Sequence, residues 1–172
     1  MQFPITAALF AYVLTLPAAA PPPDRAPAVG VASFEALPKP LPLPYDEKAD
    51  AEAAVKAAKA RAIKGHKLLL IDLGGNWCLD CRLLAGTLEL PKLKPWVERH
   101  YELVTVDIGR FDRNLAIPVR YGVGSRPEGV PALLVVDPKT NKLLNGGRVS
   151  ALADARSLTP QALADWLAQW TR

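Results

Sequence analysis

The sequence predicts an α/β domain in which a central mixed β-sheet is flanked by helices. Two apolar runs, at residues 67–73 and 101–107, are separated by helical sequence, which is typical of two parallel strands joined by a crossover. The first run does not alternate with polar residues, so we expect a strand that is covered on both faces. A third run at 130–137 is followed by a short turn and a fourth run at 142–149, which predicts an antiparallel pair.

Helical sequence precedes, separates and follows these strands. Residues 46–64 are rich in Ala, Lys and Glu and contain neither Gly nor Pro, with Asp46 as the expected N-cap and Gly65 as the expected stop. Further helical segments are expected at 79–88, at 95–100, in broken form at 111–121, and after Thr159-Pro160 at the C-terminus.

Two segments precede the domain, which is expected to span residues 45–172. Residues 1–20 carry no charged side chain, and the apolar run at 5–16 suits a signal peptide but is too short to span a bilayer. We therefore expect export, or an uncleaved N-terminal anchor; a disordered tail rich in Ala and Pro is the alternative. Residues 21–44 hold eight of the 17 prolines and are expected to form an extended linker, acting as a semi-rigid spacer.

Composition and spacing exclude several functional classes. The net charge of +4 comes from 21 basic and 17 acidic residues that are interleaved, so no nucleic-acid partner is expected. Two cysteines rule out a multi-disulfide scaffold and a four-cysteine zinc site. A mixed zinc site would require His66 and His100 to converge on both cysteines, and haem attachment fails because Arg82 stands where His is needed. No metal or organic cofactor is expected; metal delivery lacks a nearby Met or His.

The two cysteines, Cys78 and Cys81, are predicted to form a redox-active pair. They lie where the first strand passes into a helix, so Cys78 meets the free N–H groups and the positive end of the helix dipole, which stabilise a thiolate. Cys81 lies one turn further on, close enough to close a disulfide. Cys78 can then attack a substrate disulfide and Cys81 can resolve the mixed disulfide. A structural disulfide is the alternative, although so short a loop would constrain the unfolded chain little.

Two motifs together resemble the thioredoxin superfamily. Residues 72–82, Asp-Leu-Gly-Gly-Asn-Trp-Cys-Leu-Asp-Cys-Arg, are similar to its active-site region, and Gly129-Val130-Pro131 before an apolar strand is similar to its second signature. The resemblance covers roughly residues 48–172 and is to bacterial exported thioredoxin-like proteins in particular. It implies a thioredoxin-like fold, thiol–disulfide oxidoreductase activity on protein substrates, and a periplasmic or secreted location. A reductase that turns over would need an electron donor, expected to be a membrane thiol carrier.

The resemblance implies a role for each matching position. Cys78 is the nucleophile and Cys81 is the resolving cysteine. Trp77 is the aromatic residue that shields the site, although a core tryptophan is the alternative. Pro131 is the cis-proline opposite the disulfide, and Val130 offers backbone groups to an extended substrate by strand addition.

Asp72 matches the buried carboxylate of the superfamily, which implies a general base for Cys81, acting directly or through water. Independently, an aspartate that ends a buried apolar run is a residue whose pKa burial would raise. An aspartate at an exposed strand end is the alternative. Leu103 stands where the superfamily has a buried lysine, so no electrostatic support for Asp72 is expected from that position.

Departures from the superfamily pattern concern partner choice and redox direction. Leu79-Asp80 replaces Gly-Pro between the cysteines, and the loop before Pro131 is longer, with Arg126 and Glu128 added. The Asp80 carboxylate disfavours a thiolate on Cys78, an effect that Arg82 would partly offset. Because a less stable thiolate disfavours the reduced form, Asp80 favours a reductant over a disulfide donor.

A non-catalytic role is the rival interpretation. In it, the domain grips an extended protein partner beside Pro131 while the two cysteines stay static.

Overall fold

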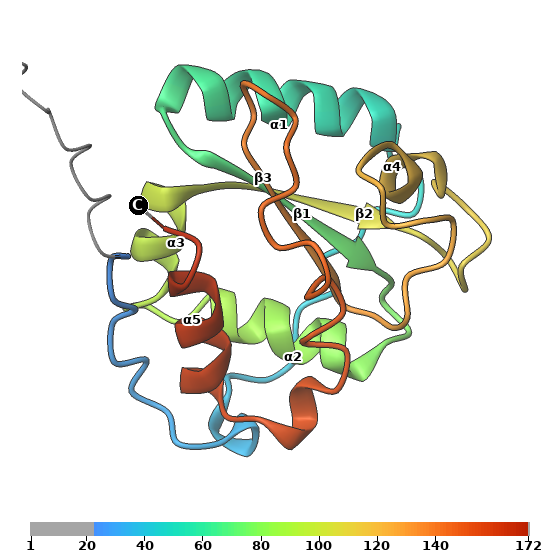
Figure 1. Ribbon diagram of the computed structural model, residues 1–172. Coiled ribbons are helices and arrows are strands. Elements are labelled where there is room, and N and C mark those ends of the chain that lie inside the picture. The colour runs from blue at the N-terminus through green and yellow to red at the C-terminus, as the bar shows by residue number, and fades with distance from the viewer. Residues whose placement is uncertain (1–22, 172) are drawn as a thin grey trace, which may run out of the picture.

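The computed structural model describes residues 23–171, and Figure 1 shows how their elements are arranged. The expected signal or anchor segment at 1–20 lies outside these residues. Within the described part, a three-stranded mixed sheet lies between two layers of helices, which confirms the predicted α/β fold class. In a search of the same residues, no helix is both long enough and apolar enough to cross a membrane.

The central strand is β1 (Leu68–Gly74), with β2 (Tyr101–Asp107) on one side and β3 (Ala132–Val136) on the other. β1 and β2 are parallel and pair residue for residue over their whole length, which confirms the predicted crossover unit. β3 pairs antiparallel with β1. The carboxyl ends of β1 and β2 therefore meet at one edge of the sheet, and the segments that follow them leave from that edge.

Helices cover both faces of the sheet (Figure 1). α1 (Ala51–Gly65) and the short α4 (Ala116–Arg120) pack on one face. α2 (Leu79–Leu88), α3 (Lys94–His100) and α5 (Pro160–Ala168) pack on the other. α2 has the predicted bounds, whereas the predicted broken helix at 111–121 is reduced to α4.

The side chains of β1 enter two separate cores in alternation. Leu70 belongs to the core under α2, α3 and α5, whereas Leu69 and Ile71 belong to the core under α1. All three are fully buried, which explains why the run shows no polar alternation. By the same alternation, Asp72 shares the face of Leu70 and points to the side that α2 covers.

α1 begins later than predicted, and its N-cap is Asp50 rather than Asp46. The Asp50 carboxylate accepts a hydrogen bond from the backbone N–H of Ala53 at 3.0 Å. The Asp46 carboxylate accepts one from Lys48 instead, in a turn that precedes the helix. Both aspartates are good N-caps, so cap chemistry alone does not choose between them. α5 is capped by Thr159 and begins at Pro160, as predicted.

The predicted fourth strand at 142–149 does not form. The segment lies beside β3 and forms one isolated bridge with it, together with scattered backbone hydrogen bonds such as that from Leu144 N–H to the Val135 carbonyl (2.8 Å). Asn145 interrupts the ladder, because its side chain accepts a hydrogen bond from the N–H of Val135 (2.9 Å) and donates one to the carbonyl of Leu133 (2.8 Å). A buried side chain thus takes the place of backbone pairing at these two groups.

Residues 23–45, which we call the N-terminal strap, are largely extended, with one 3₁₀ turn at Phe34–Ala36. The expectation of a semi-rigid spacer is corrected for this stretch: the strap passes along α5 and α2 (blue to cyan in Figure 1), and its apolar side chains enter the core. Burial of these side chains between the prolines is favourable and holds the strap down. The buried strap side chains are Val29, Phe34, Leu37, Leu41 and Tyr45.

Candidate active site

The candidate site lies at the turn between β1 and α2. A side chain at Gly74 would collide with the hydroxyl of Tyr45 and would come within 2.7 Å of the sulfur of Cys81, so the turn requires glycine there. The Asn76 side chain joins this turn to the strap, since it donates to the carbonyl of Tyr45 (2.7 Å) and accepts from its N–H (3.1 Å). Cys78 follows as the N-cap of α2.

Cys78 lies at the N-terminus of α2, as predicted, and its sulfur accepts a hydrogen bond from the backbone N–H of Cys81 at 3.2 Å. Hydrogen bonding from the Cys81 side chain and backbone lowers the pKa of Cys78, outweighing burial and the charge of Asp80. The helix N-terminus thus favours the Cys78 thiolate.

The two cysteines are free thiols and differ in access. Cys78 is 5% exposed and Cys81 is fully buried. Cys78 is therefore less open than a sulfur displayed at a helix tip, but it is the one that a substrate can reach. The hydrogen bond to Cys78, burial and the charge of Asp72 together raise the pKa of Cys81 well above its usual range. Cys81 therefore needs a base before it can act as a nucleophile.

Asp72 is the buried carboxylate that can serve as this base for Cys81. It is 1% exposed, which excludes the alternative of an exposed strand end. Burial raises the pKa of Asp72 to about 7, although a hydrogen bond from the Tyr45 hydroxyl (2.9 Å) acts in the opposite direction. Leu103 lies opposite Leu70 in the β1–β2 register, and the residue opposite Asp72 is Thr105. Support for Asp72 therefore comes from the strap instead of from β2.

Asp80 is paired, but not with Arg82. Its buried carboxylate accepts hydrogen bonds from the side chain of Arg156 (3.1 and 3.2 Å from Nε) and from the Arg156 backbone N–H (2.9 Å). These interactions hold the pKa of Asp80 below its usual range against the effect of burial. Arg82 donates to the carbonyls of Leu41 and Pro42 in the strap. The expected offset of the Asp80 charge therefore comes from Arg156.

Val130 and Pro131 lie against Cys78. The peptide bond between them is cis, as the resemblance implies. The Val130 carbonyl accepts a hydrogen bond from the sulfur of Cys78 at 3.5 Å, so the two signatures meet in space although they are 52 residues apart.

Trp77 flanks the pair on the surface and is not a core tryptophan. Its side chain is exposed to 45%, and its Nε1 donates to the carbonyl of Gly109 at 2.8 Å. The guanidinium of Arg110 lies over the indole ring, 4.6 Å from its centroid. Arg126, in the longer loop, stacks similarly on Phe111 at 4.7 Å.

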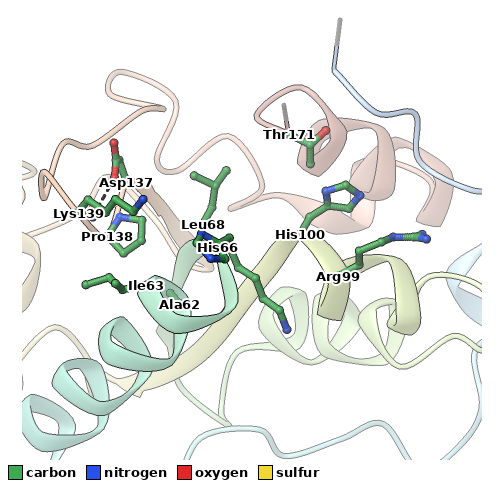
Figure 2. Close-up of a pocket in the computed structure, with 11 residues that line it drawn as sticks. Ala62, Ile63, His66, Leu68, Arg99, His100, Asp137, Pro138, Lys139 and Thr171 are labelled. Atoms are coloured by element: carbon green, nitrogen blue, oxygen red, sulfur yellow. Dashed lines mark hydrogen bonds between the residues drawn. The ribbon is translucent and has the colours of Figure 1, made fainter. Parts of the chain in front are cut away.

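The two histidines line the same cavity, which lies far from the cysteines. His66 and His100 line one cavity of about 410 Å³ with Leu68, at the start of β1, and Asp137, after the end of β3 (Figure 2). Cys78 and Cys81 follow the other end of β1, so the zinc alternative fails. Among residues 23–171, no group of three or more His, Cys, Asp or Glu side chains could hold a metal ion.

A family model described as thioredoxin-like matches residues 50–138, which is more than half of the chain. The chain belongs to the thioredoxin-like family. The crystal structure of disulphide isomerase from Xylella fastidiosa Temecula1 is 38% identical with a TM-score of 0.67; the match covers 76% of this chain and 98% of that one. Both findings agree with the fold and with the place of the cysteine pair in it.

Two further similarities cover smaller parts of the chain. The thioredoxin of Alicyclobacillus acidocaldarius subsp. acidocaldarius is 34% identical over 67 residues, which cover 39% of this chain and 59% of that relative. This chain thus spans less than two thirds of the curated relative. The oxidised C-terminal domain of DsbD from Neisseria meningitidis is 24% identical with a TM-score of 0.40, over 53% of this chain and 77% of that domain.

Sequence reasoning missed two residues of this thioredoxin-like site, Tyr45 and Arg156. Both lie outside the matched residues 50–138 and reach the site only through the fold. No local pattern marks Arg156. Tyr45 follows the last proline of the proline-rich segment and precedes α1, which in sequence indicates only a boundary.

Proposed function

We propose that this thioredoxin-like protein is a thiol–disulfide oxidoreductase that acts on protein substrates through Cys78 and Cys81. One observation carries the proposal: a cysteine of lowered pKa at the N-terminus of α2 has a second thiol and a buried carboxylate behind it. A binding module with static cysteines would not require a reactive thiol, a second thiol and a buried carboxylate in this order. The Val130 carbonyl, 3.5 Å from the Cys78 sulfur, supports substrate binding at the same place.

The reaction begins when the Cys78 thiolate attacks one sulfur of a substrate disulfide. A bond forms between Cys78 and that sulfur, and the other substrate sulfur leaves as a thiolate. Cys81 then passes its proton to Asp72 and attacks the sulfur of Cys78. The Cys78–Cys81 disulfide forms, the second substrate thiolate leaves, and the substrate has gained two electrons from the pair.

Substrate binding is proposed to use strand addition beside Val130. An extended segment that pairs with the backbone there would bring its disulfide to Cys78, since the Val130 carbonyl already lies 3.5 Å from the Cys78 sulfur. The exposed ring of Trp77 would form one wall of this path. Arg126 and Glu128, in the longer loop before Pro131, are proposed to contribute to partner choice.

We propose that the protein works as a reductant. Hydrogen bonding at the N-terminus of α2 lowers the pKa of Cys78, but the charge of Asp80 acts in the opposite direction and by itself favours the disulfide form of the pair. Arg156 pairs with Asp80 and offsets part of that charge. The direction is tested by equilibrating the protein with glutathione buffers. A reduction potential of about −120 mV for the cysteine pair, the value for DsbA, would exclude a reductant.

Disulfide isomerisation is the second candidate. It is favoured by the likeness to the disulphide isomerase of Xylella fastidiosa, which matches over 98% of its length. An isomerase rearranges disulfides without net transfer of electrons, so the pair must start reduced in that role also. Refolding of a substrate with scrambled disulfides, without added reductant, would separate the two: an isomerase restores native pairings in excess over the protein, whereas a reductase stops after one equivalent.

Location and electron supply are proposed from the sequence. The apolar run at 5–16 supports export to the periplasm or outside the cell, or retention at the membrane by an uncleaved anchor. A protein reductase in that compartment would be recharged by a membrane thiol carrier. Immunoblotting of periplasmic and membrane fractions tests this location.

The activity is tested by insulin reduction with the wild type, Cys81→Ser and Cys78→Ser. We expect activity in the wild type alone. Cys81→Ser should accumulate a mixed disulfide at Cys78, because the resolving thiol is missing, and Cys78→Ser should trap nothing. A wild type that neither reduces insulin nor traps a substrate, but still binds an extended peptide beside Pro131, would support the binding module instead.

A further inference from the structure

The N-terminal strap is fastened to the redox centre itself. Arg82, next to Cys81 in α2, donates to two strap carbonyls at 3.2 Å. On β2, the Thr105 hydroxyl donates to the carbonyl of Pro44 at 2.8 Å. With the two bonds between Asn76 and Tyr45, these contacts hold the end of the strap against β1, α2 and β2 at one point.

This attachment brings the Tyr45 hydroxyl next to the Asp72 carboxylate and near the buried sulfur of Cys81. Tyr45 is 3% exposed, and its hydroxyl donates to Oδ1 of Asp72 at 2.9 Å. The Tyr45 hydroxyl and the Cys81 sulfur both occupy the space that a side chain at Gly74 would fill, so these two atoms are neighbours. Burial and Asp72 raise the pKa of Tyr45 far above its usual range, so the hydroxyl stays a donor wherever Asp72 titrates.

We propose that Tyr45 is a positioning residue of the redox centre, which orients the Asp72 carboxylate toward Cys81 and keeps it ionised. This inference rests on the proposed function, because it concerns the proton that leaves Cys81. The hydroxyl gives its single proton to Oδ1. The other oxygen, Oδ2, accepts no hydrogen bond within residues 23–171 and is left for the proton of Cys81.

The direction of the effect follows from the surroundings of Asp72. The titratable groups that face it are Tyr45 from the strap and Cys81 from α2; its neighbours across the sheet, Thr105 and Leu133, do not titrate. A hydrogen bond to the ionised carboxylate stabilises that form. Removal of the hydroxyl therefore leaves less ionised Asp72 near neutral pH.

Tyr45→Phe tests the proposal in the full chain, with resolution of a preformed mixed disulfide at Cys78 followed from pH 6 to pH 9. We expect resolution about fivefold slower at pH 7, because a one-unit rise in the pKa of the base from about 7 lowers its ionised fraction there from about one half to about one tenth. The rates should converge toward pH 9. A purely structural role would slow resolution equally at every pH. An equal loss at every pH, or no loss, would overturn the proposal.

Tyr101→Phe is the matched control. It makes the same change of side chain and removes one buried hydrogen bond, from Tyr101 to the carbonyl of Leu167 at 2.6 Å, away from the site. Its pH profile should match that of the wild type. A second variant, Asn76→Ala, loosens the backbone of Tyr45 and should shift the profile in the same direction, but less.

A readout that needs no substrate separates the two proposals. The pH titration of Asp72 is followed by NMR of its carboxyl carbon in the reduced protein. Its midpoint should move to higher pH in Tyr45→Phe and stay in place in Tyr101→Phe. An unmoved midpoint would overturn the role of Tyr45. A wild type that lacks exchange activity would overturn the proposed function alone, because the midpoint is read without turnover.

Discussion

Arg156 binds the carboxylate of Asp80, although the two residues are 76 positions apart in the chain. Asp80 itself lies between the two cysteines of the pair. Asp80 is buried, whereas the Arg156 side chain is 58% exposed. Burial of an unpaired carboxylate next to Cys78 would be costly, so the arginine makes an acidic residue tolerable at this position.

Arg156→Gln is expected to raise the pKa of Cys78, because the Asp80 charge is then no longer offset. Alkylation of Cys78 by iodoacetamide at pH 7 should become several-fold slower, and the redox potential should become more reducing. Arg82→Gln is the matched control: it removes the same charge next to Cys81 but no partner of Asp80. Equal slowing in both variants would contradict a specific role for Arg156.

Asp72→Asn is expected to stabilise the protein in a pH-dependent way. The pKa of folded Asp72 is about 7, against an ordinary value of 3.8. Stability associated with the neutral acid is therefore fully present below about pH 4 and is lost as the pH rises through about 7. The variant should gain up to about 4 kcal/mol over the wild type above pH 7, and little at pH 4. Urea unfolding at a series of pH values measures this, and a constant difference would contradict a raised pKa.

Gly74→Ala is expected to damage both stability and activity. The added methyl group collides with the Tyr45 hydroxyl and approaches the Cys81 sulfur to 2.7 Å, so strap and helix must separate. We expect a loss of about 1–3 kcal/mol in the free energy of unfolding. Gly146→Ala is the control, since its nearest neighbour would be 3.9 Å away. A Gly74→Ala protein as stable as this control would show that the turn can open without cost.

Asn145→Ala is expected to be strongly destabilising although it lies outside the sheet. The change leaves the Val135 N–H and the Leu133 carbonyl without partners in a fully buried region, at about 1–3 kcal/mol each. Asn145→Asp retains the acceptor and loses the donor, so it separates the two contributions. Thermal unfolding monitored by circular dichroism measures both variants. Wild-type stability in Asn145→Ala would mean that backbone pairing replaces the side chain.

The sequence alone was sufficient for the parts of this protein that depend on neighbours along the chain. The unbroken apolar run of β1 predicted a strand buried on both faces. The cysteine spacing at a strand-to-helix junction predicted that Cys78 lies at a helix N-terminus, and the same junction placed Asp72 in a buried strand. These features follow from backbone geometry and burial periodicity, which a few adjacent residues determine.

Only the tertiary structure decided the contacts made across the chain. It brought Tyr45 to Asp72 and Arg156 to Asp80, sent Arg82 to the strap, and used Asn145 in place of a fourth strand. A buried carboxylate must find a partner, but many donors along the chain can satisfy it, and only packing selects one. The local surroundings of Cys78 were therefore readable from the sequence, whereas the groups that tune its charge were not.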